Sequence, residues 1–119
     1  GASALFHSAL GRAKSLGKTE LGQDLAARLA LVDRERGDLN EARTVLQGCL
    51  KFWTDRRHPR WIAQTQRQLG SVELAAENVE LARQLLETSR DSFKALGDNH
   101  GAEQAEQWLS KLRQLSEPR

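Results

Sequence analysis

The chain has 119 residues, of which 39% are hydrophobic and 29% charged, and this balance predicts one folded domain rather than a disordered chain. The formal net charge of +2 is too small to require a nucleic-acid partner. Apolar runs are only a few residues long, far short of the roughly 20 that cross a bilayer, so neither a membrane segment nor a signal peptide is expected.

Residue usage favours helix throughout. Only two prolines are present, and Ala, Leu, Glu, Gln and Arg are abundant while β-branched residues are sparse. The single cysteine, Cys49, can form neither an internal disulfide nor, alone, a metal cluster, which indicates a reducing, cytoplasmic location. The chain begins Gly1-Ala2-Ser3 and lacks methionine, which suggests a fragment of a longer protein. The predicted fold class is all-α.

Six helices are expected in chain order. Apolar residues recur at the spacing i, i+3, i+4, i+7, and turn signals separate the periodic segments. The predicted helices lie near 3–16, 19–36, 39–55, 59–76, 79–96 and 99–115. Connections of two to four residues force neighbouring helices to run antiparallel, which predicts stacked helical hairpins.

Glycines mark several helix ends. Gly17, Gly37 and Gly97 each follow an apolar-periodic run, where a left-handed residue is expected to close the helix. Among the starting signals, Asp38 with Glu41 three residues later resembles a capping box.

Two other positions are typical of the first turn of a helix. Pro59 fits the first turn of a helix, where its missing N–H is not needed, and Asp98 next to Asn99 supplies another N-cap.

A shift of forty residues brings like residues of the sequence into register. Ala42-Arg43 falls on Ala82-Arg83, and Leu46 falls on Leu86. Trp53 falls on Phe93, which predicts a core position for this tryptophan. Because the register continues without an insertion, residues 1–119 are expected to form one repeat domain of about three hairpins.

The repeated residues resemble a known family. Leu69-Gly70, followed by Ala82 and Leu86, is similar to the tetratricopeptide repeat signature, and Gly37 holds the glycine position between two helices one unit earlier. The forty-residue unit resembles those of bacterial signal-transducing regulators and of adaptor proteins. This resemblance implies a right-handed α–α superhelix that acts as a protein- or peptide-binding scaffold in signalling, with no enzymatic activity and no cofactor.

The resemblance also implies where a partner binds, namely on the concave face formed by the first helix of each hairpin. The inward-facing positions step by three or four along the helices at 19–36, 59–76 and 99–115. They are Asp24, Ala27, Leu31, Arg34, Arg60, Gln64, Arg67, Ser71, Leu74, Gln104, Gln107, Lys111 and Gln114. Arginine and glutamine suit a peptide of modestly acidic sequence. The alternative interpretation is an ordinary solvated face.

Other features suggest competing functions. The basic stretch from Lys51 to Arg67 contains Trp53 and Trp61 and could bind nucleic acid, but core packing of both tryptophans is the preferred interpretation. Trp108 lies on the last helix, which has no successor to cover it, so the end helices are expected to expose apolar surface and allow self-association. A small-molecule-sensing segment of a transcriptional regulator is a further alternative.

Catalysis is not expected. His7, His58 and His100 lie in different repeat units without a carboxylate at a motif spacing, and no cluster has the spacing of metal ligands. Cys49 occupies a small-residue packing position, which predicts an inert, buried thiol.

Overall fold

A computed structural model describes residues 19–116, except for the side chain of Ser116, and this part of the chain consists of helices joined by short turns. The helices are α2 (Glu20–Glu35), α3 (Leu39–Asp55), α4 (Pro59–Ala75), α5 (Val79–Ala95) and α6 (Asn99–Ser116). The five corresponding predictions are confirmed to within one residue at each end. The predicted helix at 3–16 and its cap at Gly17 lie outside the described residues.

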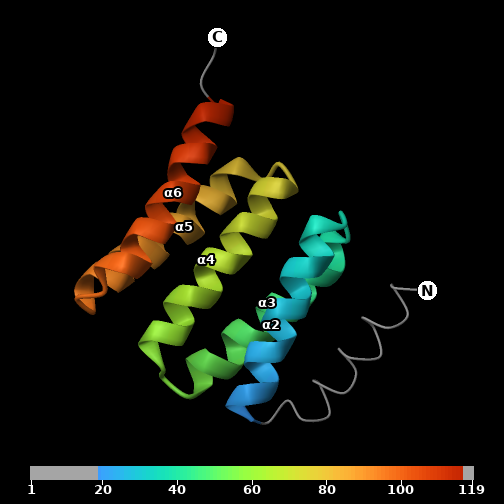
Figure 1. Cartoon of the computed structure of the whole chain (residues 1–119), viewed down its shortest axis with the longest axis vertical. Coiled ribbons are helices and arrows are strands. Elements are labelled where there is room, and N and C mark those ends of the chain that lie inside the picture. Colours follow the sequence, from blue (N-terminus) through green and yellow to red (C-terminus); the bar gives the residue numbers. More distant parts are fainter. Residues whose placement is uncertain (1–18, 117–119) are drawn as a thin grey trace.

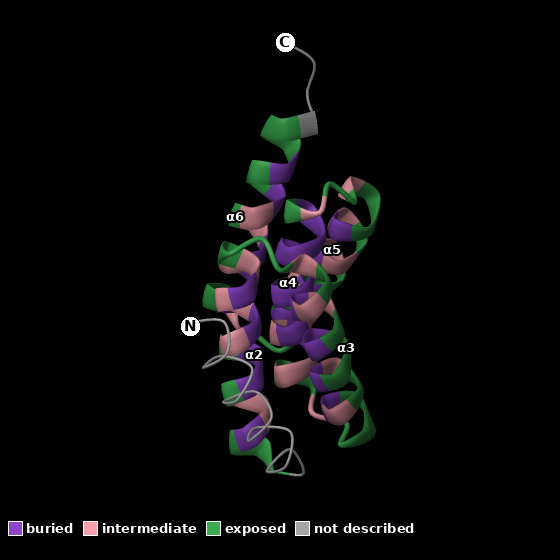
Figure 2. Ribbon diagram, turned by 90° about the vertical axis from the view of Figure 1, so that its right-hand side faces the viewer, coloured by how far each residue is buried: buried purple, intermediate pink, exposed green. Residues whose placement is uncertain are grey.

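The helices form two layers. Helices α2, α4 and α6 run in the same direction at the front of Figure 1, and α3 and α5 run in the opposite direction behind them. Each helix packs against the next, and α4 also contacts both α2 and α6. Buried residues concentrate on α4, which lies between the other helices in Figure 2.

The turns between these helices share one geometry. The second residue of each three-residue turn has a positive φ: 83° at Gly37, 54° at Arg57, 66° at Glu77 and 73° at Gly97. The N–H of the next residue then donates to the carbonyl five residues back, for example from Asp38 to Asp33 over 2.8 Å. This is the Schellman motif, repeated every twenty residues. The predicted roles of Gly37 and Gly97 are confirmed, and Arg57 and Glu77 fill the same position without glycine.

The N-terminal signals are confirmed in part. Pro59 occupies the first turn of α4, and the Asp98 carboxylate accepts a hydrogen bond from the N–H of Gly101 at 2.9 Å. Asp38 precedes α3, but its side chain accepts no capping hydrogen bond, so the predicted capping box is wrong. With φ −81° and ψ 62°, Asp38 lies outside the extended conformation that aims a capping side chain at the first-turn N–H groups.

Aromatic packing between α3 and α4 confirms the predicted core role of Trp53. This side chain is 2% exposed, and its ring stacks on Trp61 with centroids 5.0 Å apart. Forty residues later, Phe93 packs where Gly101 leaves room, since a Cβ at Gly101 would lie 2.4 Å from the Phe93 ring. The repeat therefore keeps the same contact with a different pair of residues.

A buried ion pair fixes α4 to α3. Glu73 is 1% exposed, and the Arg43 guanidinium donates to its carboxylate from Nη2 at 2.6 Å and from Nε at 2.9 Å. The side-chain amide of Asn78, in the turn after α4, donates to the same carboxylate at 3.0 Å. These hydrogen bonds, with that from Arg43 the strongest, hold the pKa of Glu73 below its usual range despite burial. The bridge therefore ties two helices and a turn together.

The left-handed turn residue generates a stability prediction. Glu77 carries a Cβ at φ 66°, a conformation that disfavours L-residues other than glycine. We expect Glu77→Gly to raise the free energy of unfolding by about 1 kcal/mol, measured by urea denaturation. Glu77→Ala is the matched control, because it removes the same charge but keeps the Cβ. An equal gain in the alanine variant would contradict the conformational explanation.

Candidate partner-binding site

The sequence-predicted site residues lie on α2, α4 and α6, the three helices of the front layer in Figure 1. Four of them, Arg34, Ser71, Leu74 and Lys111, line a single open hollow of about 330 Å³. The side chains of Glu35, Ala75, Trp108 and Leu115 complete its walls. The structure thus brings together predicted residues from all three helices.

Arg34 is at the centre of this hollow. Its Nη1 donates to Ser71 Oγ on α4 at 2.7 Å, and its guanidinium lies 5.3 Å from the ring centroid of Trp108 on α6. The Nε and Nη2 groups also donate to Glu35, at 3.2 and 2.5 Å. One side chain of α2 therefore reaches across α4 to α6.

Ser71 differs from its predicted role as a partner contact. It is 2% exposed, and its hydroxyl donates to the carbonyl of Gln68 at 2.6 Å while accepting from Arg34. A side chain so covered positions Arg34 and does not meet a partner directly.

Trp108 is the residue that sequence reasoning misplaced. The expectation was an apolar surface left open on the last helix, but the ring is half-buried and faces the hollow. The Lys111 ammonium lies 4.4 Å from the centroid of the Trp108 ring, so Lys111 is a second cation beside this ring in addition to Arg34. Cations near an indole face are attracted by its quadrupole. The signal available in the sequence was the spacing of three residues between Trp108 and Lys111, which puts both on one helix face.

Arg67 lies one turn before Ser71 on α4 and adds a third cation. Its Nε is buried and has no hydrogen-bond acceptor among the described residues. Burial, together with the nearby Arg34 charge, lowers the pKa of the Arg67 guanidinium. A positive charge that is partly desolvated and lies near a like charge favours an incoming anion.

The other predicted residues do not reach the hollow. Asp24 pairs with Arg28 at 3.2 Å, and Arg60 pairs with Asp98 at 3.7 Å. Gln64 and Gln104 are half-buried, and Gln107 lines a separate shallow depression on α6. The predicted inward-facing residues therefore fall into two groups: those that meet at the hollow and those that lie apart from it.

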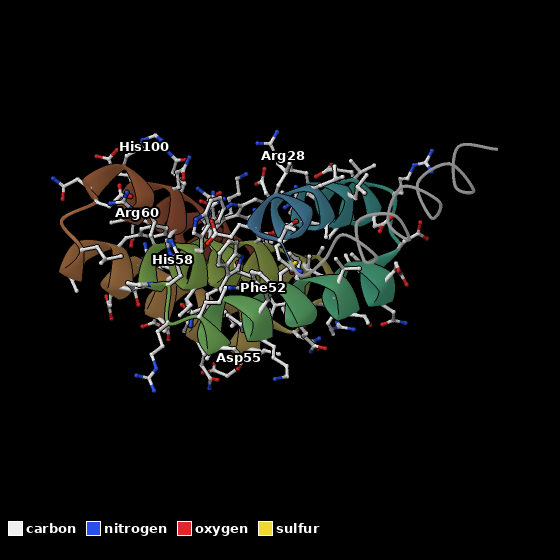
Figure 3. All side chains as sticks on the ribbon, turned by 90° about the horizontal axis from the view of Figure 1, so that it is seen from below. Arg28, Phe52, Asp55, His58, Arg60 and His100 are labelled. Atoms are coloured by element: carbon white, nitrogen blue, oxygen red, sulfur yellow. The ribbon has the colours of Figure 1, made fainter. Side chains whose placement is uncertain are left out.

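A second cluster lies where α3 ends and α4 begins, on the end of the molecule seen in Figure 3. His58 contacts Trp53 edge-on at 5.4 Å, and the Arg56 guanidinium lies 4.2 Å from the Phe52 ring centroid. These aromatic rings pack on one another and on Trp61, so the tryptophans of the basic stretch serve the core as expected.

Metal-ligating side chains and the Cys49 thiol are two kinds of group in the described residues with catalytic potential. Within residues 19–116, no group of three or more His, Cys, Asp and Glu side chains could hold a metal ion. Cys49 is 2% exposed, and its thiol donates to the carbonyl of Gln23 at 3.7 Å. Burial raises the pKa of this thiol to about 11, so it remains protonated at neutral pH.

Comparison with protein-family models identifies the family of this chain. A family model for the tetratricopeptide repeat matches residues 23–95, from the first turns of α2 to the end of α5. The chain belongs to the tetratricopeptide repeat family. Proteins with these repeats serve as scaffolds for protein–protein interaction.

Comparisons with curated proteins and with solved structures identify no significant match to this tetratricopeptide repeat chain. Among the described residues, no helix combines the length and apolar character needed to cross a membrane.

The buried thiol gives a pH-dependent prediction. A rise in the pKa of Cys49 from 9.0 to about 11 lowers the thiolate population at pH 8 by about a hundredfold. We expect the native protein to react with a disulfide reagent far more slowly than the urea-unfolded chain, and the native rate to climb as the pH approaches 11.

The unfolded chain is the control for intrinsic reactivity. Equal rates for native and unfolded protein at pH 8 would show that the thiol is neither buried nor protonated as described.

Proposed function

We propose that this chain is a protein- or peptide-binding scaffold whose partner lies against α2, α4 and α6. The observation that carries the proposal is the hollow shared by Arg34, Ser71, Trp108 and Lys111, since three separate helices contribute to it. Trp and Arg are among the residue types enriched in the few positions that carry most of the binding energy of protein interfaces. The right-handed superhelical twist implied by the family would curve these helices around a partner segment.

The charge of the site supports an acidic partner. Arg34, Arg67 and Lys111 lie in or beside the hollow, and Glu35 is the carboxylate that pairs with Arg34. Nucleic acid is a weaker candidate, because Trp53 is buried and stacked on Trp61 and so offers no free ring face to a base.

Self-association through the end helices has less support. In α4, Ala63 and Gly70 form a close surface for α5, where Ser89 donates to the Ala63 carbonyl at 2.6 Å. The equivalent positions forty residues later on α6 are Glu103 and Ser110, and both are exposed. A polar outer face of this kind is typical of a repeat that faces solvent.

The proposal places the chain in a cytoplasmic signalling or regulatory protein, as one domain of a longer polypeptide, and without catalytic activity. The support for this placement is the scaffold role of the family, together with the resemblance of the forty-residue unit to those of bacterial signal-transducing regulators. A small-molecule-sensing role would use the same hollow, but its open shape would leave much of a small molecule exposed, whereas ligand pockets bury most of the ligand surface.

A selection experiment tests the proposal. Peptides selected from a random display library on the folded protein should bind through α2, α4 and α6. We expect Lys111→Glu to weaken the selected peptides by about tenfold or more, because a repulsive charge replaces an attractive one beside Trp108.

Lys94→Glu is the matched control. This exposed lysine lies on α5, in the other layer, and undergoes the same charge change. Equal losses in the two variants, or no peptide that competes for the α2, α4 and α6 face, would contradict the proposed site.

A further inference from the structure

The ion pair between Arg34 and Glu35 is one that a carboxylate of a partner could replace. Glu35 is the next residue in the chain, and one of its oxygens, Oε1, receives hydrogen bonds from both Nε and Nη2 of Arg34. The Glu35 side chain is 71% exposed, whereas that of Arg34 is 17% exposed. An exposed carboxylate keeps its hydration when it leaves, so this ion pair contributes little to stability and exchanges readily.

Two contacts that do not involve Glu35 also hold the Arg34 guanidinium. Its Nη1 donates to Ser71, which is buried, and its planar group lies against Trp108. The edge formed by Nε and Nη2 is therefore held facing Glu35 by contacts that do not involve Glu35. That edge is the one arginine uses to bind a carboxylate, with two N–H groups pointing the same way.

The charges around the hollow are unbalanced. Arg34 and Lys111 line it and Arg67 adjoins it, while Glu35 is the one carboxylate among residues 19–116 that lines it. The Arg67 Nε is also buried without an acceptor among the described residues. A second anion would therefore lower the repulsion between the cations, and it would do so in a partly desolvated place.

The remaining walls are apolar. Leu74 and Ala75 of α4, Leu115 of α6 and the Trp108 ring line the same hollow. Leu115 is 72% exposed, so an apolar side chain of a partner would cover surface that now meets solvent. Because the cations lie close to the Trp108 ring, a nucleobase finds no open face to stack on, whereas a peptide can place an anion and an apolar group side by side.

We propose that the hollow binds an acidic side chain of a partner peptide next to an apolar one, and that Glu35 occupies Arg34 in the free protein and is displaced by the partner's carboxylate. This inference rests on the proposed function and specifies its partner. Glu35 acts as an internal competitor, so it sets the affinity for acidic segments and disfavours neutral ones.

Two short synthetic peptides test the inference by NMR titration: acetyl-Ser-Gly-Glu-Leu-Gly-Ser-amide and its counterpart with glutamine in place of glutamate. We expect the glutamate peptide to shift the Trp108 indole signal and to bind at least about threefold more tightly than the glutamine peptide. Higher salt should weaken the glutamate peptide selectively. Equal affinities, or no shift of the Trp108 signal up to about 10 mM peptide, would overturn the inference.

Variants of the competitor give the sharper result. Glu35→Gln should tighten the glutamate peptide by about threefold or more, since it removes the competing charge and keeps the side-chain shape. Glu87→Gln, on α5, makes the same change in net charge away from the hollow and should leave the affinity unchanged. If Glu35→Gln weakens or does not alter binding, or if Glu87→Gln tightens it equally, displacement of Glu35 is wrong.

The two proposals fail differently. Library peptides that compete at α2, α4 and α6 but show no preference for acidic residues would overturn this inference and leave the scaffold proposal intact. Failure of every selected peptide to use that face would overturn both.

Discussion

The left-handed residue that closes each helix is the constraint from which the rest of the architecture follows. At Gly37, Arg57, Glu77 and Gly97 the chain turns through the same Schellman motif, and the next helix begins two residues later. Each helix and its turn therefore take up twenty residues, and alternate helices run in the same direction. The forty-residue repeat of the sequence is the length of two such units.

This repetition gathers the candidate site. Because α2, α4 and α6 are parallel, side chains near their C-terminal ends lie at one end of the front layer. Arg34, Ser71 and Lys111 each belong to such an end, and Arg34 is long enough to contact both Ser71 and Trp108. The energetics are those of a half-buried cationic site, in which attraction to an anion exceeds that on an open surface.

The fold could be predicted from the sequence because its signals are local. The spacing of apolar residues predicted the helices. Gly37 and Gly97 marked two of the turns, and Pro59 marked the start of α4. The turns at Arg57 and Glu77 carry no glycine, so residue type did not mark them. The missing capping bond of Asp38 depends on its backbone torsion in the turn, which residue type alone does not determine.

For the candidate site, the sequence predicted which helices and which helix faces carry the residues, but not which side chains contact one another. The family resemblance placed Arg34, Ser71 and Lys111 on inward faces, but burial of Ser71 depends on how closely α2 and α4 approach. Trp108 was misassigned because its environment is set by a side chain of α2, which lies more than seventy residues away in sequence. Long-range contacts of this kind depend on the stagger between helices and have no local signal.

The contact between α2 and α6 is the most direct test of this account, because it requires both the turn geometry and the parallel front layer. Nuclear Overhauser contacts can be measured between the ring protons of Trp108 and the side-chain methylene protons of Arg34. The account predicts such contacts together with contacts from Lys111 to the same ring. A Trp108 ring that contacts only its neighbours on α6 would contradict it.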